Sequence, residues 1–132
     1  MRVTSLDIAT MLEATNLQLV YKTNLFIGKE PSSPSNTVTI FDTTHHGPTV
    51  FIDKADEYER PSVQVRVRSS DYTTGWTLIN NIRKELHNKG NFAFYGSFYT
   101  VIYCEMGPVH LDWDENSRAR FICNFQMQRR EN

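Results

Sequence analysis

The chain has 132 residues, of which 39% are hydrophobic and 12% aromatic, too many for an intrinsically disordered protein. Lys and Arg (14) nearly balance Asp and Glu (15), which argues against a dedicated duplex-binding protein, because such proteins usually carry a basic excess. The length is typical of one domain, and we see neither a secretory signal nor the ~20 consecutive apolar residues of a membrane span. We therefore expect a single soluble domain over residues 1–132, made in a cytoplasm.

The first third of the chain predicts one helix and two strands. Thr4 or Ser5 is suited to cap a helix that runs to about Ala14. The signals that follow are a short strand, a Pro- and Ser-rich loop and a second strand, over residues 24–28, 30–36 and 37–42. Residues 43–61 are typical of a loop, interrupted by the apolar run 50–52.

The clearest alternation of apolar and polar residues spans 62–68 and predicts a half-buried strand. Its inner face carries Val63, Val65 and Val67, and its basic outer face carries Gln64, Arg66 and Arg68. Ser70 or Asp71 then caps a long helix that we expect to end at Gly90, with His87 and Lys89 in its last turn. One side of this helix is built to cover a sheet, with Trp76, Ile79, Ile82 and Leu86.

Three more strands are expected, over residues 97–106, 109–113 and 118–128. The first is apolar on both faces, which favours a central position in the sheet. The predicted fold class is α+β, a single domain with an antiparallel or mixed β-sheet covered by two α-helices. Cys104 and Cys123 lie outside any CxxC motif, so we interpret both as buried, reduced core thiols.

Catalytic and metal motifs are weak. His45 and His46 are adjacent, and His110 and Asp112 fall on one face of a predicted strand, but two ligands are too few for a metal site. The acidic run Asp112, Asp114 and Glu115 is typical of a solvated turn. Nucleophile-elbow and phosphate-binding glycine motifs are missing from the sequence. We therefore predict no catalytic, cofactor-binding or metal-binding residues.

The basic face of strand 62–68 and the acidic turn 112–115 form two charged patches of opposite sign. The basic face alone fits a solvated surface, a nucleic-acid patch or half of a subunit interface. Two complementary patches at different places let subunits join head to tail, and such a contact closes into a ring if its rotation divides a circle. The residues predicted for subunit or partner contacts are Arg66, Arg68, Asp114, Glu115 and Arg118.

The order and spacing of several short motifs carry a resemblance over residues 5–129. They are Asn24-Leu25-Phe26-Ile27-Gly28 with Pro31, Tyr58-Glu59-Arg60-Pro61 before the 62–68 strand, Asp71-Tyr72 and Leu86 in the long helix, and Asp114-Glu115, Arg118, Phe121 and Asn124-Phe125. In this order they resemble the tail terminator and minor capsid proteins that join heads and tails in tailed bacteriophages. The segment His45-His46-Gly47-Pro48 departs from the family, where a stretch richer in glycine and proline is expected.

The resemblance implies a non-enzymatic virion protein that forms a hexameric ring on the head-proximal end of the tail tube. The ring stops tube polymerisation and presents a surface to the head connector. The implied partners are other copies of the chain, the tail tube protein and the connector or stopper protein, with genomic DNA only passing through the ring lumen. The location is the tail–neck junction of the virion, after assembly in the host bacterial cytoplasm. The long segment 43–60 is a candidate for contacts with the tube or a neighbouring subunit.

Three alternatives remain open from the sequence. The nearest is a head-completion or connector-stopper protein of the same neck. A small enzyme would use His110 with Asp112 or Asp114. A nucleic-acid-binding module would use four arginines, Arg66, Arg68, Arg129 and Arg130.

Overall fold

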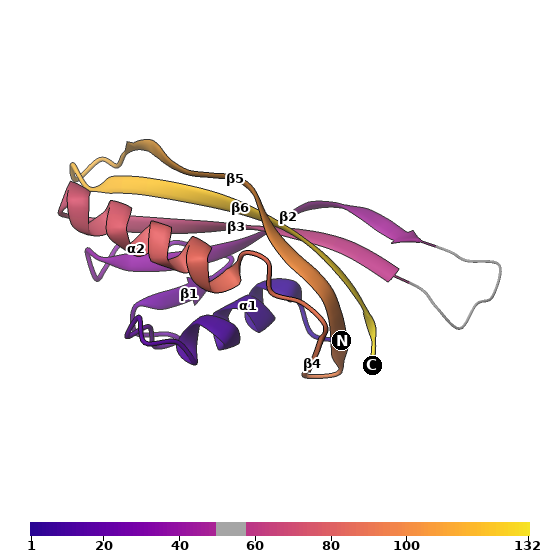
Figure 1. Cartoon of the computed structure of the whole chain (residues 1–132). Helices are drawn as coiled ribbons and strands as arrows, with labels where there is room; N and C mark the ends of the chain where they lie inside the picture. The colour runs from indigo at the N-terminus through magenta and orange to yellow at the C-terminus, as the bar shows by residue number, and fades with distance from the viewer. Residues whose placement is uncertain (50–57) are drawn as a thin grey trace.

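The computed structural model describes residues 1–49 and 58–132, with the backbone alone over residues 44–49. Two helices accompany one six-stranded sheet (Figure 1). The helices are α1 (Thr4–Glu13) and α2 (Tyr72–Leu86). The strands are β1 (Leu25–Ile27), β2 (Thr37–Thr49), β3 (Tyr58–Ser69), β4 (Phe92–Phe94), β5 (Ser97–Trp113) and β6 (Ala119–Glu131). Their order across the sheet is β1-β2-β3-β6-β5-β4, with β1 parallel to β2 and every other pair antiparallel, so the predicted α+β class is confirmed.

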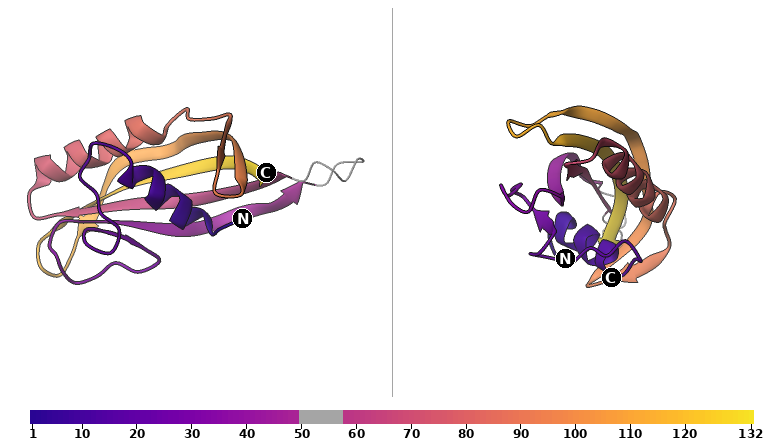
Figure 2. Two further views of the ribbon diagram at one scale, coloured as in Figure 1. Left: turned by 90° about the horizontal axis from the view of Figure 1, so that it is seen from below. Right: turned by 90° about the vertical axis from the view of Figure 1, so that its left-hand side faces the viewer.

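The sheet curls, and both helices lie inside the curl against its concave face (Figure 2). The central pair β3 and β6 places apolar residues of both strands side by side on that face. The paired residues are Val63 with Phe125, Val65 with Cys123, and Val67 with Phe121. All six are fully buried, and Ile8 and Leu12 of α1 and Ile79, Ile82 and Leu86 of α2 complete the same core. The predicted inner faces of β3 and α2 are therefore confirmed for these residues, whereas Trp76 stays 43% exposed and meets the ring of Phe121 only by its edge.

A side chain of strand β2 caps the N-terminus of helix α1. Neither Thr4 nor Ser5 is the cap: both are helical residues, and Val3 holds the N-cap position without a side-chain bond. Asp42 of β2 accepts hydrogen bonds from the Ser5 backbone N–H at 3.0 Å and from its hydroxyl at 2.6 Å. A carboxylate at a helix N-terminus satisfies free N–H groups and complements the dipole, so β2 fixes where α1 begins.

Helix α2 begins as predicted and ends earlier. The Asp71 carboxylate accepts the N–H of Thr74 at 2.9 Å, which confirms Asp71 as the cap. The helix ends at Leu86, so His87 and Lys89 lie beyond its last turn, and Asn88 rather than Gly90 takes a positive φ of 67°. The chain leaves the helix because residues 88 and 89 pair with Ile102 of β5 through hydrogen bonds of 2.8 and 2.7 Å.

The predicted loop 43–61 is largely strand where it is described. β2 continues to Thr49 and β3 starts at Tyr58, and their ends extend beyond the helices in Figure 1. The pairs His46 with Arg60 and Thr49 with Tyr58 follow register shifts, so this part of the ladder lacks the regular alternation that a sequence pattern detects. The apolar run 50–52 lies outside the described residues.

Strand β5 is one long irregular strand in place of the two that were predicted, and it is not central. It pairs with β6 along its length, while β4 covers only residues 97–99 on the other side. Register shifts interrupt its alternation, so Tyr99 and Ile102 are both fully buried. Gly107 (φ 101°) lies at one shift, where a β-carbon would come within 2.7 Å of the Ile122 carbonyl oxygen.

The two cysteines lie close together on neighbouring strands. Both thiols are free, with their sulfur atoms 3.2 Å apart. Cys123 is buried as predicted, whereas Cys104 is only half-buried because β5 lies near the sheet edge. Burial, with a hydrogen bond to Cys104, raises the pKa of the Cys123 thiol far above its usual range.

The core contact of α2 gives a stability prediction. Replacing the fully buried Ile82 by Ala leaves a cavity against the sheet and should lower the free energy of unfolding by about 2–5 kcal/mol. Urea unfolding followed by circular dichroism measures this change. Lys84→Ala on the exposed side of α2 is the control and should change stability by no more than about 0.5 kcal/mol. Equal effects of the two substitutions would contradict the packing of α2 on the sheet.

Candidate functional site

Four of the five predicted contact residues meet at one end of the sheet. Arg68, Asp114, Glu115 and Arg118 line a groove of about 400 Å³ between the loop 28–36 and the turn that joins β5 to β6. Glu30 and Arg120 line the same groove. We call this set of six residues the charged cluster. Arg66, the fifth predicted residue, is not part of it.

Asp114 organises the turn between β5 and β6. Its carboxylate accepts the N–H groups of Asn116 and Arg118 at 3.0 and 2.8 Å, and the Arg118 Nε at 2.7 Å. Burial opposes ionisation of this carboxyl, but the hydrogen bonds from Arg118 and Asn116 outweigh burial and lower its pKa. Asp114 and Arg118 are both buried and paired, so the predicted solvated turn is wrong for Asp114, whereas Asp112 and Glu115 are exposed as predicted.

Arg68 and Arg118 hold the loop 28–36 against the sheet. The Arg68 guanidinium contacts Glu30 at 3.2 Å and donates to the carbonyl oxygens of Pro34 and Ser35 at 2.7 and 3.2 Å. Arg118 donates to the carbonyl oxygen of Ser32 at 2.9 Å. Burial and the nearby positive charge of Arg118 lower the pKa of Arg68, against the opposing effect of Glu30. Arg68 was predicted on a basic outer face, yet only 3% of it is exposed because this loop covers it.

Glu30 and Arg120 were missed by the sequence analysis. The Glu30 carboxylate lies 3.4 Å from Arg120 as well as 3.2 Å from Arg68, and Arg120 lies 3.1 Å from Asp112. Glu30 stands in a loop without periodicity, so no local pattern links it to the sheet. Most charges of the cluster therefore neutralise one another inside the subunit, whereas Glu115 is exposed and has no ion pair among the described residues.

Arg66 lies on the convex face, which neither helix covers. Its guanidinium stacks 4.8 Å from the ring centre of Phe41 and donates to Gln64 Oε1 at 3.0 Å. Gln64 in turn donates to Asn124 Oδ1 at 3.2 Å. This row of half-buried polar groups is held in place by its own hydrogen bonds and remains partly open to solvent.

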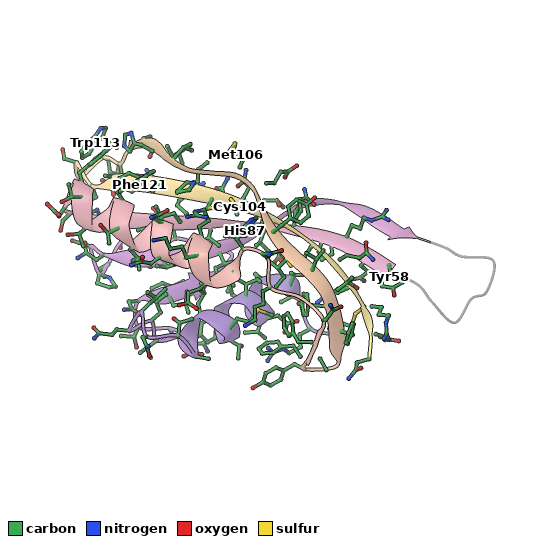
Figure 3. All side chains as sticks on the ribbon, in the orientation of Figure 1. Tyr58, His87, Cys104, Met106, Trp113 and Phe121 are labelled. Carbon is green, nitrogen blue, oxygen red and sulfur yellow. The ribbon has the colours of Figure 1, made fainter. Side chains whose placement is uncertain are left out.

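His110 and Asp112 do not share a face, contrary to the prediction. A register shift between them pairs His110 with Phe121 and Asp112 with Arg120, which are consecutive residues and so point to opposite faces. The His110 ring packs 5.4 Å from the ring centres of Phe121 and Trp113, beside Tyr72 at the start of α2. Figure 3 shows Trp113 and Phe121 together at this end of β5 and β6. Within residues 1–49 and 58–132, no three or more His, Cys, Asp or Glu side chains gather as a metal site would require.

The four arginines of the nucleic-acid alternative are dispersed. Arg68 belongs to the charged cluster, and Arg129 is buried where it contacts Glu59 at 3.0 Å and the Arg2 carbonyl oxygen at 2.9 Å. Arg130 stacks on Phe98 instead. Two of the four therefore lack the exposure that phosphate contacts need.

A second buried network joins the two ends of the chain. The Tyr99 hydroxyl donates to Asp7 of α1 at 2.5 Å, and Arg129 of β6 lies 3.5 Å from the same carboxylate. Arg2 contacts the other oxygen of Asp7 at 2.8 Å. Burial and the carboxylate of Asp7 raise the pKa of Tyr99 well above its usual range, so the phenol keeps its proton and donates.

The described helices include none long and apolar enough to cross a membrane. The sequence signature of a family described as "Bacteriophage tail terminator protein" matches residues 4–130. The chain belongs to this family, a family of structural phage proteins and not of enzymes. The expected family is thereby confirmed.

A solved structure has the same fold. It is a chain of the "Virion of native gene transfer agent (GTA) particle", with a TM-score of 0.68 and 10% sequence identity. The similarity covers 98% of this chain and 95% of that chain. None of the curated proteins matches the sequence. At 10% identity the comparison establishes the shared fold alone.

The Asp114–Arg118 pair gives a pH-dependent prediction. Asp114→Asn keeps an oxygen for the backbone N–H groups but removes the charge facing Arg118, and should cost about 1.5–3 kcal/mol of stability at pH 7. The folded pKa of Asp114 is depressed, so its contribution is complete above the ordinary pKa near ~3.9 and is lost as the pH falls through the lower folded value.

Urea unfolding of both proteins at pH 7 and at pH ~3 measures this difference, which should shrink in acid. Glu115→Gln is the matched control, because Glu115 is the exposed neighbour without an ion pair among the described residues. A difference that stays constant with pH, or that appears equally in the control, would refute the role of this pair.

Proposed function

We propose that this protein is a tail terminator in the strict sense, a subunit of a homo-oligomeric ring that caps the head-proximal end of the phage tail tube. The observation that supports this most directly is the family match over residues 4–130, almost the whole chain. The proposed ring is a hexamer, and it stops tube polymerisation by occupying the surface on which the next ring of tube subunits would bind. The protein acts as one domain over residues 1–132 and is not an enzyme.

The proposed partners are three proteins: other copies of this chain, the tail tube protein and the head connector or stopper. The tail–neck junction of the virion is the corresponding location, reached by assembly in the host cytoplasm. Genomic DNA meets the ring only while passing through its lumen. The occurrence of the same fold in a chain of a gene transfer agent virion agrees with a role in a phage-like particle.

The structure refines the proposed roles of the five contact residues. Arg66 and Glu115 are accessible and are proposed to face a partner directly. Arg68, Asp114 and Arg118 are buried and internally paired, so they are proposed to act indirectly, by holding the loop 28–36 and the β5–β6 turn in shape for contact. Preformed loops of this kind lower the ordering cost of association.

Tube length provides the test. Tail tubes grown without the protein should reach uncontrolled lengths, and tubes grown with it should end in an added ring, as seen by negative-stain imaging. Asp114→Asn should reduce capping by more than its loss of folded protein, because the β5–β6 turn loses its shape, whereas the control Lys84→Ala on the exposed side of α2 should cap tubes like the wild type. Equal tube lengths with and without the wild-type protein would contradict the proposal. Binding of the protein to isolated heads would instead indicate a head-completion or stopper role.

A further inference from the structure

We propose that the outer edge of β5 in one subunit docks against the surface beside β1 in a second copy of the chain, and that this is the contact repeated around the ring. The inference rests on the proposed function and specifies which surfaces make the ring. β1 and β5 lie toward opposite edges of the sheet, so such a contact joins two different patches. A head-to-tail contact of this kind closes into a ring when its rotation permits.

The edge of β5 is open and apolar. Beyond residue 104 it has β6 on one side and no strand on the other among the described residues. Of the eleven exposed large hydrophobic side chains in the described part of the chain, five lie on β5. They are Tyr103, Met106, Val109, Leu111 and Trp113, each 41–55% exposed. Figure 3 shows Met106 and Trp113 along this outer strand. Pairing with β6 places Tyr103, Met106 and Val109 on the convex face and Trp113 on the concave face, where its ring stacks on Tyr72. Exposed apolar side chains on an unpaired strand are a liability in a free monomer and are covered in an assembly.

The surface beside β1 offers a matching groove. Its volume is about 690 Å³, and its lining includes Tyr21, Phe26, Ile27 and Pro31 with the two lysines Lys22 and Lys29. The aromatic and aliphatic side chains are half-buried, so they present apolar surface without being closed off. An indole or a leucine side chain from a neighbouring β5 fits the chemistry of such a groove.

The charges of the two surfaces are complementary. Residues 103–117 contain four acidic residues, among them Glu105 and Glu115, and no Lys or Arg. Residues 17–29 contain Lys22 and Lys29 and no acidic residue. Glu30 also lines this groove, but it is half-buried and its charge is paired with Arg68 and Arg120. Lys22, Lys29, Glu105 and Glu115 are all exposed, and none makes an ion pair within the described residues. Opposite charges set the register of an apolar contact and exclude the pairing of like edges. This complementarity identifies the occupant of each surface as another copy of the same chain.

Two charge-reversal variants test the contact. The first is Lys22→Glu with Lys29→Glu, which makes both surfaces acidic; the second is Glu105→Lys with Glu115→Lys, which makes both basic. Each variant alone should fail to form rings, with self-association weakened by about 100-fold or more, because like charges face each other at every contact. An equal mixture should assemble again, since each acidic surface then meets a basic one in an alternating ring. A control with Lys84→Glu and Glu85→Lys, two exposed residues of α2, should assemble like the wild type.

Assembly is measured by analytical ultracentrifugation of the free proteins and by imaging of rings on tail tubes, so a chain that associates only on a tube still gives a result. Circular dichroism checks that every variant is folded. Normal capping of tubes by both reversed variants would overturn the proposed contact while leaving the terminator function intact. Loss of assembly by each variant without rescue in the mixture would also overturn it. A wild-type protein that neither self-associates nor caps tubes would overturn both proposals.

Discussion

The pairing of β3 with β6 is the constraint on which the rest of this structure depends. Their register sets Val63, Val65 and Val67 beside Phe125, Cys123 and Phe121, and makes one continuous apolar surface at the centre of the sheet. Burying that surface supplies the main stabilisation, and the two helices are placed where they cover it. A slip of one strand by one residue would turn its apolar side chains to the convex face, so the register is strongly specified.

Covering one face leaves the other face and the edges for interaction. The convex face is closed in part by the loop 28–36, which the charged cluster fastens to β3 and β6. These ion pairs are costly to break one partner at a time, because the charge left behind is desolvated. The cluster therefore defines the shape of the surface at one end of the sheet, while the exposed residues beside it, such as Glu115, remain free to define its charge.

The proposed terminator role requires recognition of two different partners and of other copies of the chain, and a curled sheet with distinct edges provides separate surfaces for such contacts. The likeness to a gene transfer agent chain at 10% identity shows that the fold persists when nearly all side chains differ. Such persistence is expected where the alternation of apolar and polar residues fixes the core and the surface residues are free to change. The particular edge charges of this chain are then a property of its own sequence and not of the fold.

The sequence by itself determined the α+β class, the inner face of the strand that holds Val63, Val65 and Val67, and the start of α2 at Asp71, because period-two alternation and helix capping are local signals. It also selected four residues that do meet at one place, Arg68, Asp114, Glu115 and Arg118. Only the tertiary structure decided that three of these are buried, that Glu30 and Arg120 join them, and that β5 lies near an edge. The reason is physical: register shifts erase the alternation along β5, and the loop that covers Arg68 is more than thirty residues away in the chain.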